Sequence, residues 1–184
     1  MKISIAGAGA FGSAIASVLA KGGHSIKLFS PTNFKELCAT RVTRKLSNIK
    51  LSTEIDIVSS LEKTEKNEYL FLAVPTQNLA SFCKENKSFL SDRPLIACCK
   101  GVDQATGLRP SEILSEYSSK VAVMSGPSFA VDISKGMPTA LVLASTAPGF
   151  LRKLQSDISM HNFRLYRTSD VVGVELGGAL KNII

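Results

Sequence analysis

The sequence has few residues of the kinds that build disulfide or metal-bound frameworks. Its 184 residues include only four cysteines and two histidines. The cysteines show no CxxC spacing and have no histidine cluster beside them, which argues against a disulfide scaffold and against a zinc site. We therefore expect reduced thiols, no bound metal ion and a cytoplasmic protein. The four thiols are Cys38, Cys83, Cys98 and Cys99.

Long apolar runs are also scarce. Residues 3–20 carry no charge and follow Lys2, which imitates a signal peptide. Gly7, Gly9 and Gly12 interrupt this run, and a strand, a tight turn and a helix explain the glycines better. No other stretch approaches the roughly 20 apolar residues that a membrane-spanning helix needs. We therefore expect no membrane span.

Basic residues outnumber acidic ones without forming a patch. The formal net charge is +7, which would suit nucleic-acid binding if the charge were concentrated on one face. The basic residues are instead scattered among acidic neighbours, as in the pairs Lys35-Glu36 and Lys84-Glu85. The charge thus favours small anionic ligands, and we expect no nucleic-acid partner.

The hydrophobic pattern alternates short apolar runs with longer helical periodicities. Most of the runs are continuous, which is typical of strands covered on both faces. This alternation predicts an α/β fold with a Rossmann-like, doubly wound and mostly parallel sheet. Strands are expected over Lys2–Ala6, Ser25–Phe29, Tyr69–Val74, Leu95–Cys99, Lys120–Met124, Thr139–Ala144 and Phe163–Tyr166, with a short one near Ile55–Val58. Helices are expected over Phe11–Lys21, Asn33–Lys45, Gln77–Phe89, Pro110–Tyr117, Phe129–Lys135, Pro148–Ile158 and Asp170–Ile184.

A glycine-rich turn follows the first strand. Residues 7–12 read Gly-Ala-Gly-Ala-Phe-Gly and fit the spacing GxGxxG between a strand and a helix, which is the context that gives this motif meaning. Gly7 permits the sharp turn, Gly9 lets the backbone approach a pyrophosphate, and Gly12 lets the helix pack close to the strand. The alternative is a plain tight turn. The motif predicts dinucleotide binding at the start of the helix.

The end of the second strand lacks the acidic residue that usually holds the adenosine ribose. The strand is followed by Ser30-Pro31-Thr32, and a missing carboxylate leaves room for a 2′-phosphate. Hydroxyls at Ser30 and Thr32, with Lys35 nearby, favour NADP over NAD. These residues would otherwise be ordinary turn and helix-cap residues.

Ligands of open α/β sheets bind outside the carboxyl ends of the strands. The residues expected there include Pro75, Lys100, Gly126 and Ser128. Lys100 would place a cation at this edge, and the loop with Gly126 and Ser128 would present amides and a hydroxyl to an anion. The alternatives are a solvated surface lysine and a serine that only caps a helix.

The last predicted helix contains the pair Gly177-Gly178, which is costly in a helix interior. Positions without side chains one turn before Lys181 would let a ligand approach that lysine. The alternative is close helix packing with Lys181 exposed. The chain stops at Ile184 without a glycine or a polar cap, so we interpret it as the N-terminal portion of a longer protein.

Together these segments resemble the bacterial type of NAD(P)-dependent glycerol-3-phosphate dehydrogenase. The resemblance rests on residues 7–12, 74–75, 99–101, 125–130, 136–140 and 173–182. The Ser-Gly-Pro-Ser-Phe-Ala stretch and the later Leu-Gly-Gly-Ala-Leu-Lys-Asn stretch are its most specific parts. The resemblance implies residues 1–168 as a dinucleotide-binding domain and residues 169–184 as the first helix of a C-terminal substrate domain.

The resemblance also implies an activity and roles for single residues. The enzyme would interconvert dihydroxyacetone phosphate and sn-glycerol 3-phosphate with NAD(P)H and so supply phospholipid synthesis; the full-length form could be a homodimer. Lys181 is implied as the catalytic proton donor and acceptor, and Lys100, Gly126, Ser128 and Lys181 as substrate ligands. The dinucleotide contacts implied by the resemblance or expected from the turn and strand ends are Gly7, Gly9, Ala10, Phe11, Gly12, Ser30, Pro75, Lys100 and Ala130.

Two other functions remain open at this point. One is a different reductase of the 6-phosphogluconate-dehydrogenase-like superfamily that acts on a hydroxy acid. The other is a non-catalytic dinucleotide-binding module, which would have no need for Lys181 after two helix glycines. The 184 residues by themselves would bind the cofactor without full activity, because the family's further helical domain supplies other substrate ligands.

Overall fold

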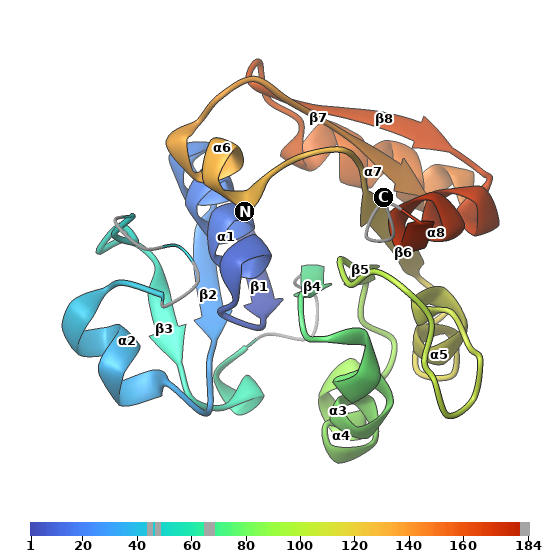
Figure 1. The fold of residues 1–184 in the computed structure, drawn as a ribbon, viewed down its shortest axis with the longest axis horizontal. Coiled ribbons are helices and arrows are strands. Elements are labelled where there is room, and N and C mark those ends of the chain that lie inside the picture. The colour runs from blue at the N-terminus through green and yellow to red at the C-terminus, as the bar shows by residue number, and fades with distance from the viewer. Residues whose placement is uncertain (44–45, 47–48, 65–68, 181–184) are drawn as a thin grey trace.

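The computed structural model describes residues 1–43, 46, 49–64 and 69–180 (Figure 1). An eight-stranded sheet has the strand order β3-β2-β1-β4-β5-β6-β7-β8. Every neighbouring pair is parallel except β6 and β7, which are antiparallel. The strands are β1 (Lys2–Ala6), β2 (Ser25–Phe29), β3 (Asp56–Val58), β4 (Tyr69–Leu72), β5 (Leu95–Ala97), β6 (Val121–Ser125), β7 (Thr139–Ala144) and β8 (Phe163–Thr168). The predicted doubly wound, mostly parallel α/β fold is confirmed.

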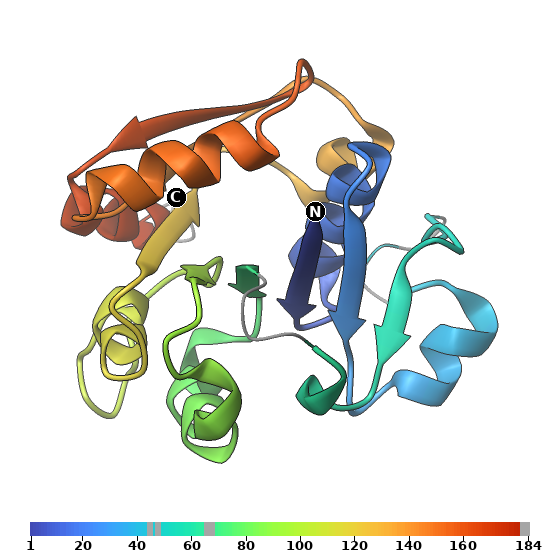
Figure 2. The same cartoon turned by 180° about the vertical axis from the view of Figure 1, so that it is seen from behind.

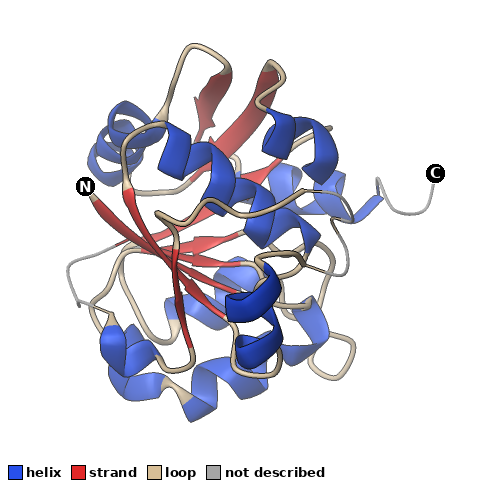
Figure 3. Cartoon of the chain, turned by 90° about the vertical axis from the view of Figure 1, so that its left-hand side faces the viewer, coloured by secondary structure: helices blue, strands red, loops and turns tan. Residues whose placement is uncertain are grey.

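Helices cover both faces of this sheet (Figure 3). One face carries α1, α6 and α7, and the other carries α3, α4, α5 and α8. Their bounds, with α2 and the two short 3₁₀ turns, are α1 (Ala10–Lys21), α2 (Phe34–Thr40), η1 (Leu61–Lys63), η2 (Thr76–Asn78), α3 (Leu79–Glu85), α4 (Lys87–Leu90), α5 (Pro110–Ser115), α6 (Ala130–Lys135), α7 (Pro148–Ile158) and α8 (Val171–Leu180).

The core forms two layers because neighbouring strand residues point to opposite faces. Ile3 and Ile5 of β1 pack in the layer under α1, whereas Ala6 packs in the layer on the other side. Cys98 and Cys99, just after β5, divide in the same way between the two layers, as their adjacency predicts. The described cysteines are all unpaired by disulfides, in agreement with the expected thiols.

The antiparallel step at β7 moves the chain back across the sheet. After β6 the chain reaches α6, which packs against α1, and β7 then returns to pair with β6. Figure 2 shows α7 lying beside β7 and β8 at the far end of the sheet. This return path places α6 beside α1, far away in the sequence, where Lys21 Nζ donates a hydrogen bond to the Ser134 carbonyl at 3.1 Å.

Two predicted helices differ most from the structure. The helix predicted over Asn33–Lys45 ends at Thr40, because Arg41 has a left-handed backbone with a φ of 59°. The helix predicted over Gln77–Phe89 is divided into η2, α3 and α4, with a break at Asn86. The Asn86 side chain donates a hydrogen bond to the Phe82 carbonyl at 2.8 Å, which competes with helix continuation.

His24, in the turn before β2, makes the stability of the fold depend on pH. Burial lowers the pKa of His24 below 6.5, the positive N-terminus lowers it further, and Asp157 opposes both effects. No described residue hydrogen-bonds its buried Nδ1 atom. The folded state therefore disfavours the imidazolium. The contribution of His24 to the free energy of unfolding is fully present above a pH of about 6.5, and it is lost as the pH falls through the pKa of His24 in the folded state.

Urea unfolding between pH values of about 7.5 and 5.5 measures this loss. His24→Gln is expected to flatten the decline, because the variant has no imidazole to protonate at this position. His161→Gln removes an exposed imidazole and is the matched control, expected to keep the wild-type decline. An unchanged decline in His24→Gln would contradict the assignment.

None of the described helices combines the length and the apolarity that crossing a bilayer requires.

Candidate functional site

The glycine-rich turn joins β1 to α1 at the place where the strand order reverses. Gly7 has a φ of 109°, a conformation that favours glycine. A Cβ atom on Gly7 would lie 2.6 Å from the Ala73 carbonyl oxygen, and one on Gly12 would lie 1.9 Å from the Gly7 carbonyl oxygen. Both positions therefore exclude any side chain, in agreement with the roles that their spacing predicts.

Gly9 differs from these two glycines because it faces open space. A Cβ atom built there would meet no atom within 4 Å. Gly9 is the N-cap of α1, with no side-chain cap, and the first turn of α1 contains no acidic residue. The first amides of the helix therefore face a cradle that an anion fits. A dinucleotide pyrophosphate matches this cradle in charge and in the close backbone approach that it needs.

The neighbouring strands close this turn on both sides. The Gly7 amide donates to the Phe29 carbonyl of β2 at 3.1 Å, and the Ala73 amide donates to the Ala6 carbonyl at 2.8 Å. Pro75 follows β4 and is exposed. Because the strand order reverses between β1 and β4, the crevice outside their carboxyl ends is where this kind of sheet binds ligands.

A small hollow lies beyond β2, on the other side of the glycine-rich turn. Ser30 is 4% exposed at this place, and its amide donates to the Val58 carbonyl at 3.0 Å. The Thr43 hydroxyl donates to the Ala8 carbonyl at 3.0 Å. The hollow is lined by residues of the turn, of the segment after β2, of α2 and of the segment after α2: Ala8, Ser30, Asn33, Glu36, Leu37, Val42 and Thr43. Glu36 is a carboxylate near the end of β2 that the sequence pattern did not predict, because it comes from α2 and not from the strand itself.

Lys100 lies at the carboxyl end of β5, as predicted, and hydrogen bonds fix the loop around it. Its Nζ atom donates to the Gly126 carbonyl at 3.3 Å, which joins the loops after β5 and β6. The Thr76 hydroxyl donates to the Lys100 carbonyl at 2.7 Å. The Gln77 amide group donates to the Val102 carbonyl at 2.8 Å. Thr76 and Gln77 are thus two supporting residues that the strand-end reasoning did not single out.

A cavity of about 270 Å³ opens between the loop after β6 and α8. Its lining is formed by Ser125, Gly126, Pro127, Val142, Gly173, Val174, Gly177 and Gly178. A Cβ atom on Gly178 would lie 2.6 Å from Ser125 Oγ and 3.8 Å from Lys100 Cγ, whereas one on Gly177 would meet nothing within 4 Å. The two glycines that are unfavourable for a helix therefore have separate structural roles: Gly178 allows close packing against Ser125, and Gly177 leaves space open.

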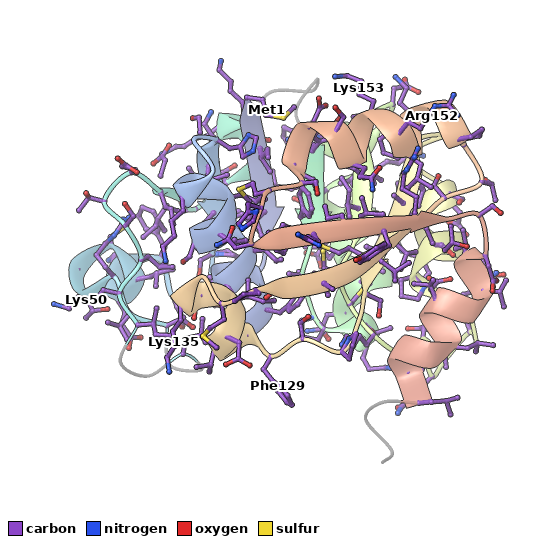
Figure 4. The ribbon with its side chains drawn as sticks, turned by 90° about the horizontal axis from the view of Figure 1, so that it is seen from above. Met1, Lys50, Phe129, Lys135, Arg152 and Lys153 are labelled. Carbon is purple, nitrogen blue, oxygen red and sulfur yellow. The ribbon has the colours of Figure 1, made fainter. Side chains whose placement is uncertain are left out.

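The remaining predicted residues of this region, Ser128 and Ala130, lie in the loop after β6 and at the start of α6. The Ser128 hydroxyl donates to the Ala140 carbonyl at 3.3 Å. Ala130 begins α6 and packs against the same core layer as Ala10 and Phe11. Phe129, between them, is 68% exposed and points away from the molecule (Figure 4).

Lys181, the predicted proton donor, lies outside the described residues. The described residues contain no group of three or more His, Cys, Asp or Glu side chains that could hold a metal ion. Burial raises the pKa of the Cys99 thiol, next to Lys100, to about 11. A thiol with this pKa is almost fully protonated at neutral pH, so Cys99 does not supply a nucleophile.

Sequence comparison assigns this arrangement to a family. Residues 2–150 match the family described as "NAD-dependent glycerol-3-phosphate dehydrogenase N-terminus". The chain is 41% identical to the glycerol-3-phosphate dehydrogenase [NAD(P)+] of Roseobacter denitrificans, over 100% of this chain and 59% of that protein. It is 40% identical to the enzyme of the same name from Thermoanaerobacter, over 100% of this chain and 57% of the relative.

A solved structure agrees with these matches. The glycerol-3-phosphate dehydrogenase of Coxiella burnetii superposes with a TM-score of 0.89 at 30% identity, over 99% of this chain and 58% of that one. This chain therefore spans less than two thirds of the length of the relatives that it matches. Since the family match covers residues 2–150, the chain belongs to the NAD-dependent glycerol-3-phosphate dehydrogenase family and corresponds to its N-terminal part.

Proposed function

We propose that the protein, in its native full-length form, interconverts dihydroxyacetone phosphate and sn-glycerol 3-phosphate with NAD(P)H. The observation that carries this proposal is the placement of Lys100 between two features. Its Nζ atom touches Gly126, which lines the cavity, and its own strand lies beside β4 at the crevice of the glycine-rich turn. A cation between a dinucleotide cradle and a cavity suits a small phosphorylated substrate.

The dinucleotide would lie across the carboxyl ends of β1 and β4. Gly7, Gly9 and Gly12 give its pyrophosphate access to the amides at the start of α1, with Ala10 and Phe11 beside it. Ser30 would face the adenosine end, and Pro75 and Ala130 would face the opposite part of the crevice. Bound NAD(P)H would supply the hydride of the reaction.

The substrate would lie in the cavity between the loop after β6 and α8. Lys100, Gly126 and Ser128 are proposed as its ligands, with the Lys100 ammonium facing the phosphate or the carbonyl oxygen. Negative charge grows on that oxygen during reduction, and a nearby ammonium stabilises it. Lys181 is proposed to donate the proton to this oxygen and to remove it in the reverse direction.

We also propose the division of the chain into residues 1–168 and the first helix of a substrate domain from residue 169 on. A cytoplasmic location and a homodimer of the full-length protein stay predictions. Sedimentation of the native protein tests the dimer, and cell fractionation tests the location.

An assay with purified native protein tests the proposed reaction. The expected result is oxidation of NADH or NADPH that depends on dihydroxyacetone phosphate and does not occur with 2-oxo acids. Turnover of 2-oxo acids alone would support the other reductase. Binding of a nicotinamide nucleotide without oxidation under any of these conditions would support the non-catalytic module.

The preference for NADP over NAD stays a prediction, and titration of the wild-type protein with both nucleotides tests it. Glu36 provides a second test, of whether a 2′-phosphate lies in the hollow beyond β2. The hydroxyls near Ser30 favour a 2′-phosphate, whereas the Glu36 carboxylate in the lining of the same hollow repels it. At contact distance in water such a repulsion is about 1 kcal/mol, or about fivefold in affinity. Glu36→Gln is therefore expected to tighten NADPH binding by about this factor and to leave NADH binding unchanged.

Fluorescence titration with each nucleotide measures this change. Glu54→Gln removes an exposed carboxylate on a turn before β3 and is the charge-matched control. An equal gain in both variants would show a general effect of net charge and would contradict a specific role for Glu36.

A further inference from the structure

α8 is a poor helix by composition although it forms one wall of the cavity. Gly173, Gly177 and Gly178 make up three of its ten residues, and glycine is the weakest helix former apart from proline. Packing against other elements provides most of the stability of such a helix. The position of the cavity wall therefore depends on what holds α8 in place.

Glu175 holds α8 through a buried carboxylate. The residue is 5% exposed. Its Oε2 atom accepts hydrogen bonds from Arg109 Nη1 at 2.8 Å and from the Ser111 hydroxyl at 2.7 Å. Its Oε1 atom accepts from the Ser111 backbone amide at 2.8 Å. Both oxygens are thus bound by the first residues of α5 and the residue before it, 64 and 66 positions away in the sequence.

Arg109 is itself fixed by a second carboxylate. Its Nη2 atom donates to Glu112 Oε1 at 2.7 Å, and its backbone amide donates to Glu112 Oε2 at 2.9 Å. The guanidinium therefore bridges Glu112 on α5 and Glu175 on α8. A planar guanidinium held at two points fixes direction as well as distance.

The adjoining side of α8 meets the cavity and the loop after β6. Gly173, Val174, Gly177 and Gly178 line the cavity, and Glu175 does not. Gly178 contacts Ser125 so closely that no side chain would fit between them. A shift of α8 would therefore change the shape of the cavity and the contact of its wall with Ser125.

We infer that Glu175 is a positioning residue for the substrate cavity: its bonds to Arg109 and Ser111 hold α8 in the one place where the glycine wall faces Lys100 and Gly126. This inference rests on the proposed function, because it assigns the cavity to the substrate. The glycine-rich turn lies at β1, and two strands, β4 and β5, separate it from β6, so the proposed pyrophosphate site does not depend on this clamp. The clamp therefore affects substrate binding much more than nucleotide binding.

Glu175→Gln in the native full-length protein tests the inference. Glutamine keeps the shape but replaces one acceptor oxygen with a donor, so it cannot accept all three bonds. The KM for dihydroxyacetone phosphate is expected to rise about tenfold or more, since small displacements in a site have large effects. The dissociation constant of NADH, measured by fluorescence, is expected to change much less than this KM.

Glu116→Gln is the matched control, because it removes an exposed carboxylate at the C-cap of α5, at the other end of that helix from Arg109 and Ser111. Its KM is expected to equal that of the wild type. Ser111→Ala removes one hydroxyl donor from Glu175 and is a milder variant in case Glu175→Gln does not fold. It should raise KM in the same direction by a smaller factor.

Hydrogen exchange gives a reading that does not need turnover. The amides of α8 are expected to exchange faster in Glu175→Gln, whereas those of α1 stay protected. A wild-type KM in both Glu175→Gln and Ser111→Ala, or a loss of NADH binding in proportion to the loss of substrate binding, would overturn the inference. If the wild-type protein does not reduce dihydroxyacetone phosphate, the proposed function fails instead, and the exchange of α8 still decides whether Glu175 holds the helix.

Discussion

Replacement of Gly12 by alanine is expected to cost the protein about 3 kcal/mol or more of folding free energy, the upper end of the range for overpacked sites. The new Cβ atom would lie 1.9 Å from the Gly7 carbonyl oxygen and 3.0 Å from the Ala73 side chain. The first of these atoms is backbone, so α1 must move away from β1 to relieve the clash. This movement would also open the core under α1 and remove the nucleotide cradle.

Gly9→Ala is the matched variant at the same turn, with a different expected result. A Cβ atom there meets no protein atom within 4 Å, and Gly9 has an extended backbone that alanine adopts. Folding should therefore stay close to wild type. The methyl group would instead occupy the space offered to the pyrophosphate, and we expect nucleotide affinity to fall by about tenfold or more, since about 1.4 kcal/mol is tenfold in affinity.

Urea unfolding and nucleotide titration of both variants separate these two effects. The expected pattern is lost stability in Gly12→Ala, and lost binding with retained stability in Gly9→Ala. Wild-type affinity in a folded Gly9→Ala variant would show that the nucleotide does not approach this part of the turn.

The second large effect is expected at Lys181. Lys181→Ala in the native full-length protein should lower turnover by about two to four orders of magnitude, the usual contribution of a general acid or base. Binding of NADH should remain nearly intact, because the residues proposed to hold its pyrophosphate lie at the glycine-rich turn. Steady-state kinetics and fluorescence titration measure the two quantities separately.

Lys153→Ala is the control for the loss of a lysine. Lys153 lies on α7, with a side chain that is 70% exposed and bonded to Asp157 (Figure 4). Its turnover should match that of the wild type. Near-normal turnover in Lys181→Ala would remove this residue from the proton-transfer role.

The sequence predicted best those helices and strands whose first and last residues are determined by their immediate neighbours in the sequence. The bounds of β1, β2, β7 and α7 agree with the structure, because apolar runs end at turn residues and Pro148 opens its helix. The glycine-rich turn could be predicted equally well, since Gly7, Gly9 and Gly12 lie within six residues of one another. The predicted helix over residues 77–89 failed because Asn86 forms its bond to Phe82 within an otherwise helical pattern.

Features that join distant segments could not be predicted from local patterns. Glu175 reads as one charged residue in an apolar helix, and nothing in its neighbourhood points to Arg109 or Ser111. Glu36 was overlooked because the acidic residue was sought at the end of β2, whereas α2 carries it to the hollow from the next element. Topology, and not spacing, brings these side chains to the site.

A crystal of the protein grown with NADH or NADPH tests the central claim most directly. The account predicts the pyrophosphate against the amides at the start of α1, in the space that Gly9 leaves open, with the nicotinamide end directed towards Lys100. A nucleotide bound elsewhere on the molecule, or calorimetric titration of folded protein that detects no binding of either nucleotide, would contradict it.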